Sequence, residues 1–274
     1  MKPAPFAFHR PSSLADALGL LAAGEARPLA GGQSLVPMLN LRLTPVDALV
    51  ELRAVPELRG AEEMPDGAVY GALVTHAAFE DGLVPDVTRG LMRHVAGRIA
   101  YRAVRNRGTI GGALALADPA ADWLTTVVAL DAEIGIVGVA GERWVKAEDF
   151  VLGPYFTILE PTELLTAVKV RRLPDTTRWG TYKVAVKAGE YAESLVIALI
   201  DTARNEGRIA LGALDGAPLL LPQSAAAACA GTGGAALAEI VRAELAGSGR
   251  DLAPAAITLH ATAVTRAIAE AVRP

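Results

Sequence analysis

The sequence contains a single cysteine, Cys229, and only four histidines. One cysteine cannot form an internal disulfide, and it cannot supply the several thiolates that bind an iron–sulfur cluster. The histidines (His9, His76, His94 and His260) show no metal-ligand spacing such as HExxH. Any redox cofactor must therefore be organic or belong to a partner protein. We expect His76 and His94 to be surface or core residues rather than catalysts.

An excess of positive charge and a long apolar run are also missing. The sequence has 26 Lys and Arg residues and 30 Asp and Glu residues, which gives a net charge of -4. This balance favours neither nucleic acid nor an anionic membrane surface as a partner. The apolar stretch at 123–140 is interrupted by Asp131 and Glu133, and residues 1–13 show no signal-peptide pattern. We predict a cytoplasmic protein without a transmembrane segment.

Helix and strand patterns are mixed along the 274 residues, of which 52% are hydrophobic. They lack the regular βαβ alternation of a doubly wound sheet, which predicts an α+β fold, with a polar boundary near 172–180. Ser12 or Ser13 can cap a first helix at 12–24. The other predicted helices lie at 87–104, at 118–131 with Asp118 as cap, and from about 222 onward, and predicted strands include 26–32, 45–52, 142–150, 163–173, 181–187, 194–204 and 207–214.

Two Gly-Gly pairs occur in short polar turns, "LAGGQSLV" at 29–36 and "GTIGG" at 108–112. Glycine allows positive φ and close approach of another group, and successive amides in such turns can bind an anion. Ser34 and Thr109 could add hydroxyl groups, and Gln33 an amide. Two such turns suit one dinucleotide, with Asp118 and Asp122 accepting hydrogen bonds from its sugar hydroxyls.

Simpler interpretations remain open. Either glycine pair can be an ordinary turn, Arg105 and Arg107 can be a solvated helix end, and Asp118 can be only a cap. A third glycine segment, "GTGGAA" at 231–236, formally matches the dinucleotide fingerprint G-x-G-x-x-A. It follows an alanine-rich run and no strand, so we predict a linker between two helices.

The segments "AGGQSLVPMLNLRL" and "VRNRGTIGGALALADPAAD" together closely resemble the FAD-binding medium subunit of the molybdenum hydroxylases, the group of carbon monoxide dehydrogenase and xanthine dehydrogenase. "PFAFHRPSSLADALGLL", "FVLGPYFTILEPTELLTAVKV" and "YKVAVKAGEYA" are similar to that family in the same order, so the resemblance covers nearly the whole chain. It implies a vanillyl-alcohol-oxidase (PCMH) type FAD-binding fold. Lobe 1 would span 1–58, lobe 2 would span 59–174, and a C-terminal sheet-and-helix domain would span 175–274.

The resemblance also implies a flavin site between the lobes. The first motif would hold the pyrophosphate through its amides, and the second would lie near the phosphates and the ribityl chain. Asp122, Leu165 and Lys183 match flavin-contacting positions of the family. With Asp118, the implied cofactor-binding residues are Leu29, Ala30, Gly31, Gly32, Gln33, Ser34, Leu35, Val36, Ile99, Thr109, Ile110, Gly111, Gly112, Ala113, Asp118, Asp122, Leu165 and Lys183.

Several positions depart from the family pattern. Ala113 and Leu116 stand where relatives commonly have Ser or Asn and His, and Ile99 stands where an aromatic residue is frequent. Glu193 and Ser194 replace small apolar residues. These differences could change the surroundings of the isoalloxazine ring. Tyr191 could pack near the ring, although an interface or core position is the preferred interpretation.

The implied function is electron transfer within a larger enzyme. A large subunit would carry molybdopterin, a small subunit would carry two [2Fe–2S] clusters, and this chain would pass electrons from FAD to an acceptor such as NAD⁺, oxygen or a quinone. The implied assembly is a dimer of heterotrimers, and no general acid or base is assigned to this chain. One alternative is a stand-alone FAD-dependent oxidase or reductase of the same fold. A second is a non-enzymatic assembly or ligand-binding protein whose glycine turns are merely structural.

Overall fold

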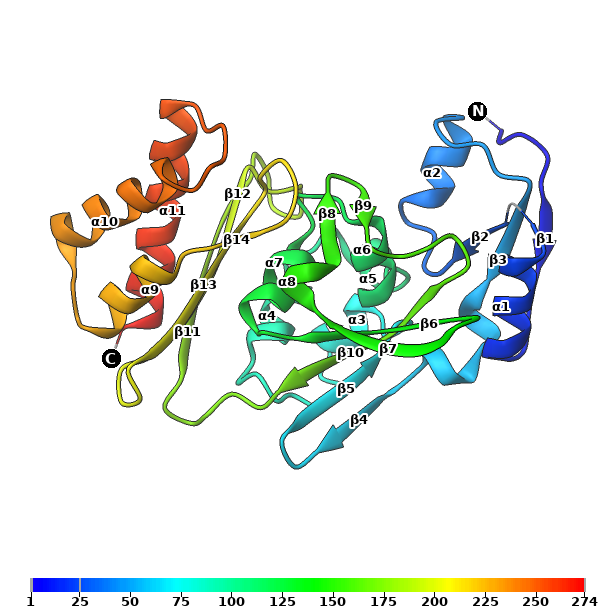
Figure 1. Ribbon diagram of the computed structural model, residues 1–274, viewed down its shortest axis with the longest axis horizontal. Helices are drawn as coiled ribbons and strands as arrows, with labels where there is room; N and C mark the ends of the chain where they lie inside the picture. The colour runs from blue at the N-terminus through cyan, green and yellow to red at the C-terminus, as the bar shows by residue number, and fades with distance from the viewer. Residues whose placement is uncertain (1, 25, 274) are drawn as a thin grey trace.

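The structure is a computed structural model that describes residues 2–24 and 26–273. Three sheets follow one another along the chain and lie in a row, from the N-terminal part at one end to the C-terminal helices at the other (Figure 1). A separate hairpin of two short strands lies beside the helices of the central part. The predicted α+β organisation is confirmed.

The first sheet is parallel, with strand order β1-β3-β2. Ser13 begins the first helix by accepting a hydrogen bond from the amide of Asp16. Ala17 and Leu21, four positions apart, then face the same side and are buried against Val50. The elements are β1 (Ala7–His9), α1 (Leu14–Ala22), β2 (Ala26–Leu29), α2 (Leu35–Asn40), β3 (Ala48–Glu51), η1 (Leu52–Ala54) and η2 (Pro56–Leu58).

The central sheet is antiparallel, with strand order β4-β5-β10-β6-β7. Its strands are β4 (Ala61–Met64), β5 (Gly67–Gly71), β6 (Glu133–Gly138), β7 (Gly141–Lys146) and β10 (Leu164–Arg171). Helices between these strands cover the sheet and enclose the largest core, which is built around Trp123 and Ile134. They are α3 (His76–Glu80), α4 (Leu91–Gly97), α5 (Arg102–Arg105), α6 (Ile110–Leu116), α7 (Asp122–Ala129) and α8 (Ala147–Phe150), which is followed by the hairpin β8 (Val151–Gly153) and β9 (Phe156–Thr157).

Three predicted elements of this part were wrong in extent. The segment 87–104 is divided into α4 and α5, because Ala100 takes a left-handed conformation with φ 42°. The helix predicted at 118–131 begins at Asp122, and Asp118 instead accepts a hydrogen bond from Ala120 in the preceding turn. The strand predicted at 142–150 ends at Lys146, where α8 follows.

The third sheet is antiparallel in chain order, with strands β11 (Arg178–Val184), β12 (Ser194–Asp201), β13 (Glu206–Gly212) and β14 (Leu219–Leu220). Its outer face carries α9 (Pro222–Cys229), α10 (Gly234–Ala246) and α11 (Pro254–Ala271), and α11 packs on β11 and β12. On the inner face, α7 packs on β12 and β13. Because both faces are covered, every residue of β12 is buried.

The segment 231–236 was predicted as a linker between two helices, and its first half is one: residues 230–233 connect α9 to α10, while 234–236 form the first turn of α10. In the part of the chain that the structure describes, no helix combines the length and the apolar character needed to cross a membrane.

Candidate functional site

The first glycine motif leaves β2 at Leu29 and enters α2 at Leu35. Gly32 has φ 77°, and its carbonyl oxygen accepts a hydrogen bond from the amide of Val36 at 3.2 Å. The four successive backbone amides at residues 32–35 have no acceptor within residues 2–24 and 26–273. Unpaired amides that follow one another through a glycine turn are the arrangement that binds an anion. The first motif therefore has free amides for the predicted anion nest, and binding of an anion there stays a prediction.

The second glycine motif differs, because its amides are bonded within the protein. Thr109 is the N-cap of α6, and its side-chain oxygen accepts from Gly112 at 3.1 Å. The amides of Ile110 and Gly111 donate to the carbonyl oxygens of Val74 and Ala72 at 3.0 and 2.9 Å. The expectation that both turns form equivalent nests was wrong. The segment after β5 supplies acceptors that the local sequence does not reveal.

The two motifs meet backbone to backbone. A Cβ atom on Gly31 would lie 2.1 Å from the carbonyl oxygen of Arg107, and one on Gly112 would lie 3.4 Å from the Cβ of Ala30. The guanidinium Nε of Arg107 also donates to the carbonyl oxygen of Gly31 at 3.4 Å. Only glycine permits this approach at residue 31. The structure therefore brings the two turns together, and the shared dinucleotide stays a prediction.

His76 packs against the second motif at Gly108. Its Nδ1 accepts a hydrogen bond from the indole Nε1 of Trp123 at 2.9 Å, and only 5% of the residue is exposed. A Cβ on Gly108 would lie 2.6 Å from its Nε2. Burial, and then the nearby charge of Arg105, lower the pKa of His76 to about 4. His76 is a neutral core histidine, as predicted.

Asp122 and Lys183 form a buried ion pair between α7 and β11. The ammonium Nζ lies 2.9 and 3.0 Å from the two carboxylate oxygens, and both side chains are 7% exposed. Burial raises the pKa of Asp122, while the charge of Lys183 and its hydrogen bond oppose that shift. The pair joins the central helices to the third sheet. Contact of either residue with a flavin stays a prediction.

Asp118 lies near two tyrosines that are largely exposed. Tyr155 is 61% exposed and Tyr191 is 62% exposed, so the core interpretation of Tyr191 was wrong. Partial burial, and then the Asp118 carboxylate, raise the pKa of each tyrosine. Tyr155 is placed by its amide, which donates to the carbonyl oxygen of Ala117 at 2.9 Å. Sequence reasoning missed Tyr155, because nothing local marks the hairpin tip as a neighbour of residue 118.

The other predicted residues occupy less exposed positions. Leu165 is 5% exposed and packs in the central core beside a bulge in β10. Ile99 is half-buried before Ala100, and Ala113 is half-buried in α6. Arg105 is not the solvated helix end that was considered, since its side chain is 12% exposed and paired with Glu80.

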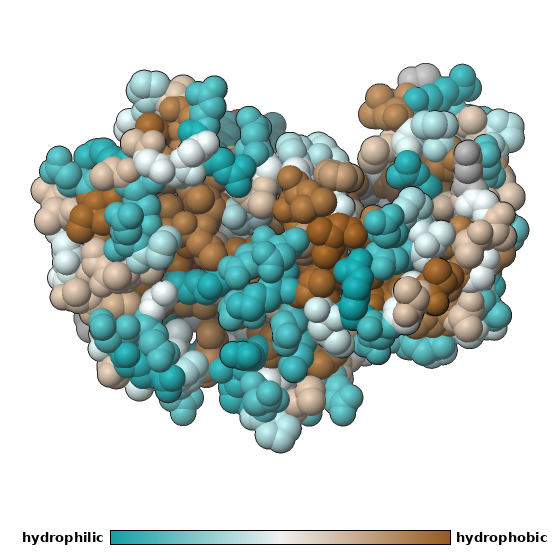
Figure 2. Space-filling model, viewed as in Figure 1, coloured by the Kyte–Doolittle hydropathy of each residue, from teal (hydrophilic) through white to brown (hydrophobic). Residues whose placement is uncertain are grey.

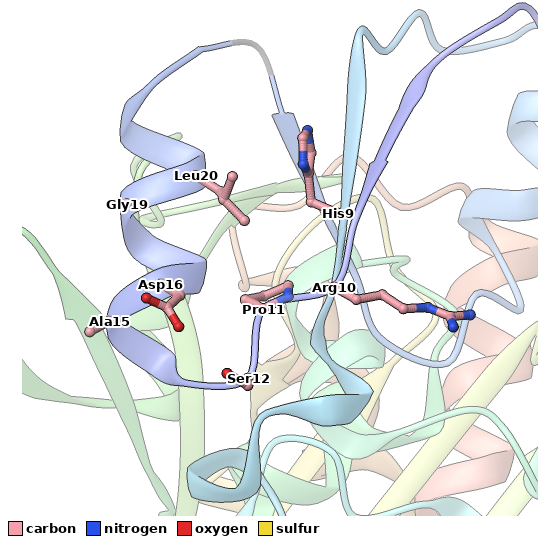
Figure 3. A pocket seen from close by; sticks show the side chains of 8 residues that line it. All are labelled: His9, Arg10, Pro11, Ser12, Ala15, Asp16, Gly19 and Leu20. Carbon is pink, nitrogen blue, oxygen red and sulfur yellow. The ribbon is translucent and has the colours of Figure 1, made fainter.

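Two surface clefts lie outside the glycine motifs. The first, of about 540 Å³, lies between the end of β1 and α1, and Arg10 points away from it (Figure 3). The second, of about 600 Å³, lies between Trp179 and α11. Apolar surface also gathers over the β8–β9 hairpin (Figure 2), where Leu152 and Phe156 are exposed. The described residues contain no group of three or more His, Cys, Asp or Glu placed to hold a metal ion.

Comparisons with known proteins agree on one family. Residues 4–173 match the family described as "FAD binding domain in molybdopterin dehydrogenase". The chain is 36% identical to the nicotine 6-hydroxylase medium subunit of Paenarthrobacter nicotinovorans over 77% of this chain and 76% of that protein. It is 38% identical to the carbon monoxide dehydrogenase medium chain of Afipia carboxidovorans over 70% of this chain and 67% of that protein.

Solved structures are similar over the whole chain. Carbon monoxide dehydrogenase from Hydrogenophaga pseudoflava, lacking the Mo-pyranopterin moiety of its cofactor, matches with a TM-score of 0.89 at 30% identity, over 99% of this chain and 98% of that one. Quinoline 2-oxidoreductase from Pseudomonas putida 86 matches with a TM-score of 0.86 at 31% identity, over the same shares.

Proposed function

Because the chain belongs to the family of FAD-binding domains of molybdopterin dehydrogenases, a family of oxidoreductases, we propose that the two glycine motifs hold a single FAD. The observation that carries this proposal is the row of four amides at 32–35 that have no acceptor among the described residues, directly after Ala30 and Gly31, which contact the second motif and the Arg107 carbonyl before it. Those amides would bind the diphosphate, since a phosphate oxygen accepts several N–H donors at once. When bound, FAD supplies the electron-transfer chemistry, and the protein supplies binding and orientation.

We assign different tasks to the two motifs. The first, Leu29 to Val36, binds phosphate through its backbone. The second, Thr109 to Ala113, is rigid, because the amides at 110–113 are already bonded, and it brings small residues close to the ligand. Asp118 is placed to accept a hydrogen bond from a sugar hydroxyl. Ile99, Asp122, Leu165 and Lys183 remain the proposed contacts of the flavin end.

We further propose that the chain is the electron-transfer subunit of a larger enzyme. The chain offers one cysteine, which is buried, and it cannot hold an iron–sulfur cluster by itself. Relatives named medium subunits or medium chains imply larger and smaller partners. The partners would be a large molybdopterin subunit and a small [2Fe–2S] subunit, in a dimer of heterotrimers. Electrons would pass from the clusters to FAD and then to an external acceptor.

We also retain the proposed division of the chain into 1–58, 59–174 and 175–274. It is supported by the three sheets, which lie within residues 7–51, 61–171 and 178–220.

The first test is the visible spectrum of the purified full-length chain, with mass analysis of what a denaturant releases. We expect a flavin spectrum and released FAD, or tight binding of added FAD by a colourless preparation. A well-folded chain that refuses FAD would refute the proposal. Substrate turnover by the isolated chain would instead favour a stand-alone oxidase or reductase.

Two substitutions test the location of the site. Gly32→Val places a side chain at φ 77° within the nest, beside Val36 and Leu29. Gly60→Val is the matched control, because Gly60 also has φ 77° but has no neighbour within 4 Å. Both should cost similar backbone strain, and only Gly32→Val should abolish FAD binding. Gly111→Val should also abolish it, because its Cβ would lie 2.5 Å from the Cβ of Ala72.

A further inference from the structure

Arg105 ends α5, two residues before the Arg107 carbonyl that contacts Gly31. Its Nε and Nη2 donate to the two carboxylate oxygens of Glu80 at 2.7 and 2.9 Å. Its Nη1 donates to the carbonyl oxygens of Ile99 and Ala100 at 3.0 and 2.9 Å. Each guanidinium nitrogen thus bonds to an acceptor on another segment, and the side chain is 12% exposed. A planar guanidinium that uses all its nitrogens in this way fixes the directions of its hydrogen bonds, in addition to supplying a positive charge. We call this arrangement the fork of Arg105.

The Ala100 carbonyl oxygen lies close to two other residues, Arg105 and Gly189. Ala100 has φ 42°, a conformation that alanine adopts at a cost and only when its surroundings impose it. Besides the hydrogen bond from Arg105, the same oxygen closely approaches Gly189, where a Cβ would lie 2.6 Å from it. Gly189 belongs to the turn closed by the bond from the Glu190 amide to the Lys187 carbonyl, and Tyr191 follows directly.

Arg105 therefore connects two segments that would border the flavin: the first glycine motif, and the 187–191 turn, which ends at Tyr191. On the side of α6, Arg107 follows two positions later, and its carbonyl group contacts Gly31 of the first glycine motif. Through Ala100, it sets how closely the 187–191 turn of the C-terminal part approaches. We propose that Arg105 is a positioning residue that fixes the separation of these two segments and thereby the seating of the flavin. The inference rests on the proposed FAD function.

Arg102 provides a matched comparison on the same helix. It also pairs with Glu80, at 2.8 Å, but it is 48% exposed, and its bonds go to side chains only. If charge near Glu80 were sufficient, the two arginines would be equivalent. If the fork on the Ile99 and Ala100 carbonyls is what matters, only Arg105 affects the flavin. Lysine preserves the charge at either position and lacks the fork.

The test compares wild type, Arg105→Lys and Arg102→Lys in the full-length chain. We would measure the FAD dissociation constant by fluorescence titration, the visible circular dichroism of bound flavin, and the flavin midpoint potential. We expect Arg105→Lys to weaken FAD binding by about tenfold or more, the effect of losing charge-assisted hydrogen bonds, and to change the dichroism. Arg102→Lys should match wild type in all three. Arg105→Lys with wild-type affinity, dichroism and potential would overturn the inference.

A second variant covers the case in which Arg105→Lys does not fold. Gly189→Ala forces the Ala100 carbonyl to move, because its Cβ would lie 2.6 Å from the oxygen, and it leaves Arg105 intact. Gly231→Ala is its control, since its φ of 78° is close to the 83° of Gly189 and it has no neighbour within 4 Å. We expect Gly189→Ala alone to alter the flavin dichroism, and an unchanged signal would contradict the inference. A wild-type chain without affinity for FAD would refute the proposed function itself, whereas normal binding with insensitive variants refutes only the role of Arg105.

Discussion

Gly31 lies where the two glycine motifs touch, and its hydrogen faces the carbonyl group of Arg107. In Gly31→Ala, the new methyl group would lie 2.1 Å from the carbonyl oxygen and 2.7 Å from its carbon. Backbone on both sides must move, so we expect a loss of about 1–3 kcal/mol in unfolding free energy and weaker FAD binding. Urea denaturation and FAD titration measure both. Gly19→Ala, which meets nothing within 4 Å in α1, should be neutral or slightly stabilising. Equal behaviour of the two variants would contradict this prediction.

His76 should make the stability of the protein depend on pH. Its folded-state pKa of about 4 lies below the ordinary histidine pKa of 6.5, because burial, and then the charge of Arg105, disfavour the imidazolium. The unfolded chain therefore binds more protons between these values. The stabilising contribution is complete above pH 6.5 and is lost as pH falls toward 4, to a total of about 3 kcal/mol.

His76→Gln keeps an acceptor for Trp123 but does not titrate. Urea denaturation of both proteins at pH 7.5, 6.0 and 4.5 isolates the effect, because the other titrating groups are common to both. The variant should lose less stability on acidification than the wild type. Parallel pH profiles would show that His76 does not titrate differently in the two states.

At the scale of elements, the N-cap residue of α6, Thr109, contributes to the stability of the protein and also belongs to the proposed FAD site. Thr109→Ala removes the oxygen that accepts from Gly112 and should cost about 1 kcal/mol. Thr75→Ala is a matched cap deletion at α3, where the side chain accepts from Ala78. Calorimetry and FAD titration should show similar losses of stability, with weaker FAD binding only in Thr109→Ala. Thr109→Ser, which keeps the oxygen, should resemble wild type.

Elements determined by local chemistry were predictable from the sequence. Ser13 was predicted as one of two possible caps of the first helix, and its side chain caps α1 through a hydrogen bond from Asp16, three positions later. The breaks at Ala100 and Ala117 were not predictable, because alanine gives no sign of a left-handed conformation. The carbonyl of each is bound from elsewhere: Arg105, five positions later, binds that of Ala100, and the amide of Tyr155, in the β8–β9 hairpin, binds that of Ala117.

The site was also predictable only where its signal is local in the sequence. The glycine spacing indicated that residues 31 and 111 belong to one place, and the structure brings the two motifs into contact. The unequal state of their amides was not visible, because the acceptors Ala72 and Val74 lie about 40 residues from the second motif. The burial of Arg105 likewise depends on Glu80, which is separated from it by 25 positions.

At the scale of the whole molecule, the Asp122–Lys183 pair joins the central part to the C-terminal sheet. Lys183→Met leaves a buried carboxylate without its partner, so we expect a loss of about 3–5 kcal/mol and uptake of a proton by Asp122. The double variant Asp122→Leu/Lys183→Met removes both charges and should be less damaging than the single change. Lys146→Met is the control, because Lys146 is 55% exposed and its pairs should contribute less than about 1 kcal/mol. Urea denaturation of wild type and the three variants checks this order, and a double variant at least as damaging as Lys183→Met would contradict it.

The position of β10 determines the order in which this protein can assemble. β10 is the middle strand of the central sheet, and its Val168 pairs with Tyr70, about 100 positions earlier. During synthesis, β5 can pair with β4 at once, but it can pair with β10 only after residue 171 has left the ribosome. Closing so long a loop is slow. The strands β11 to β13 pair with neighbours in the chain and can form quickly. Because Gly111 bonds to Ala72 directly after β5, the cofactor site should be one of the last regions to mature, and premature termination before β10 should leave a chain unable to bind FAD.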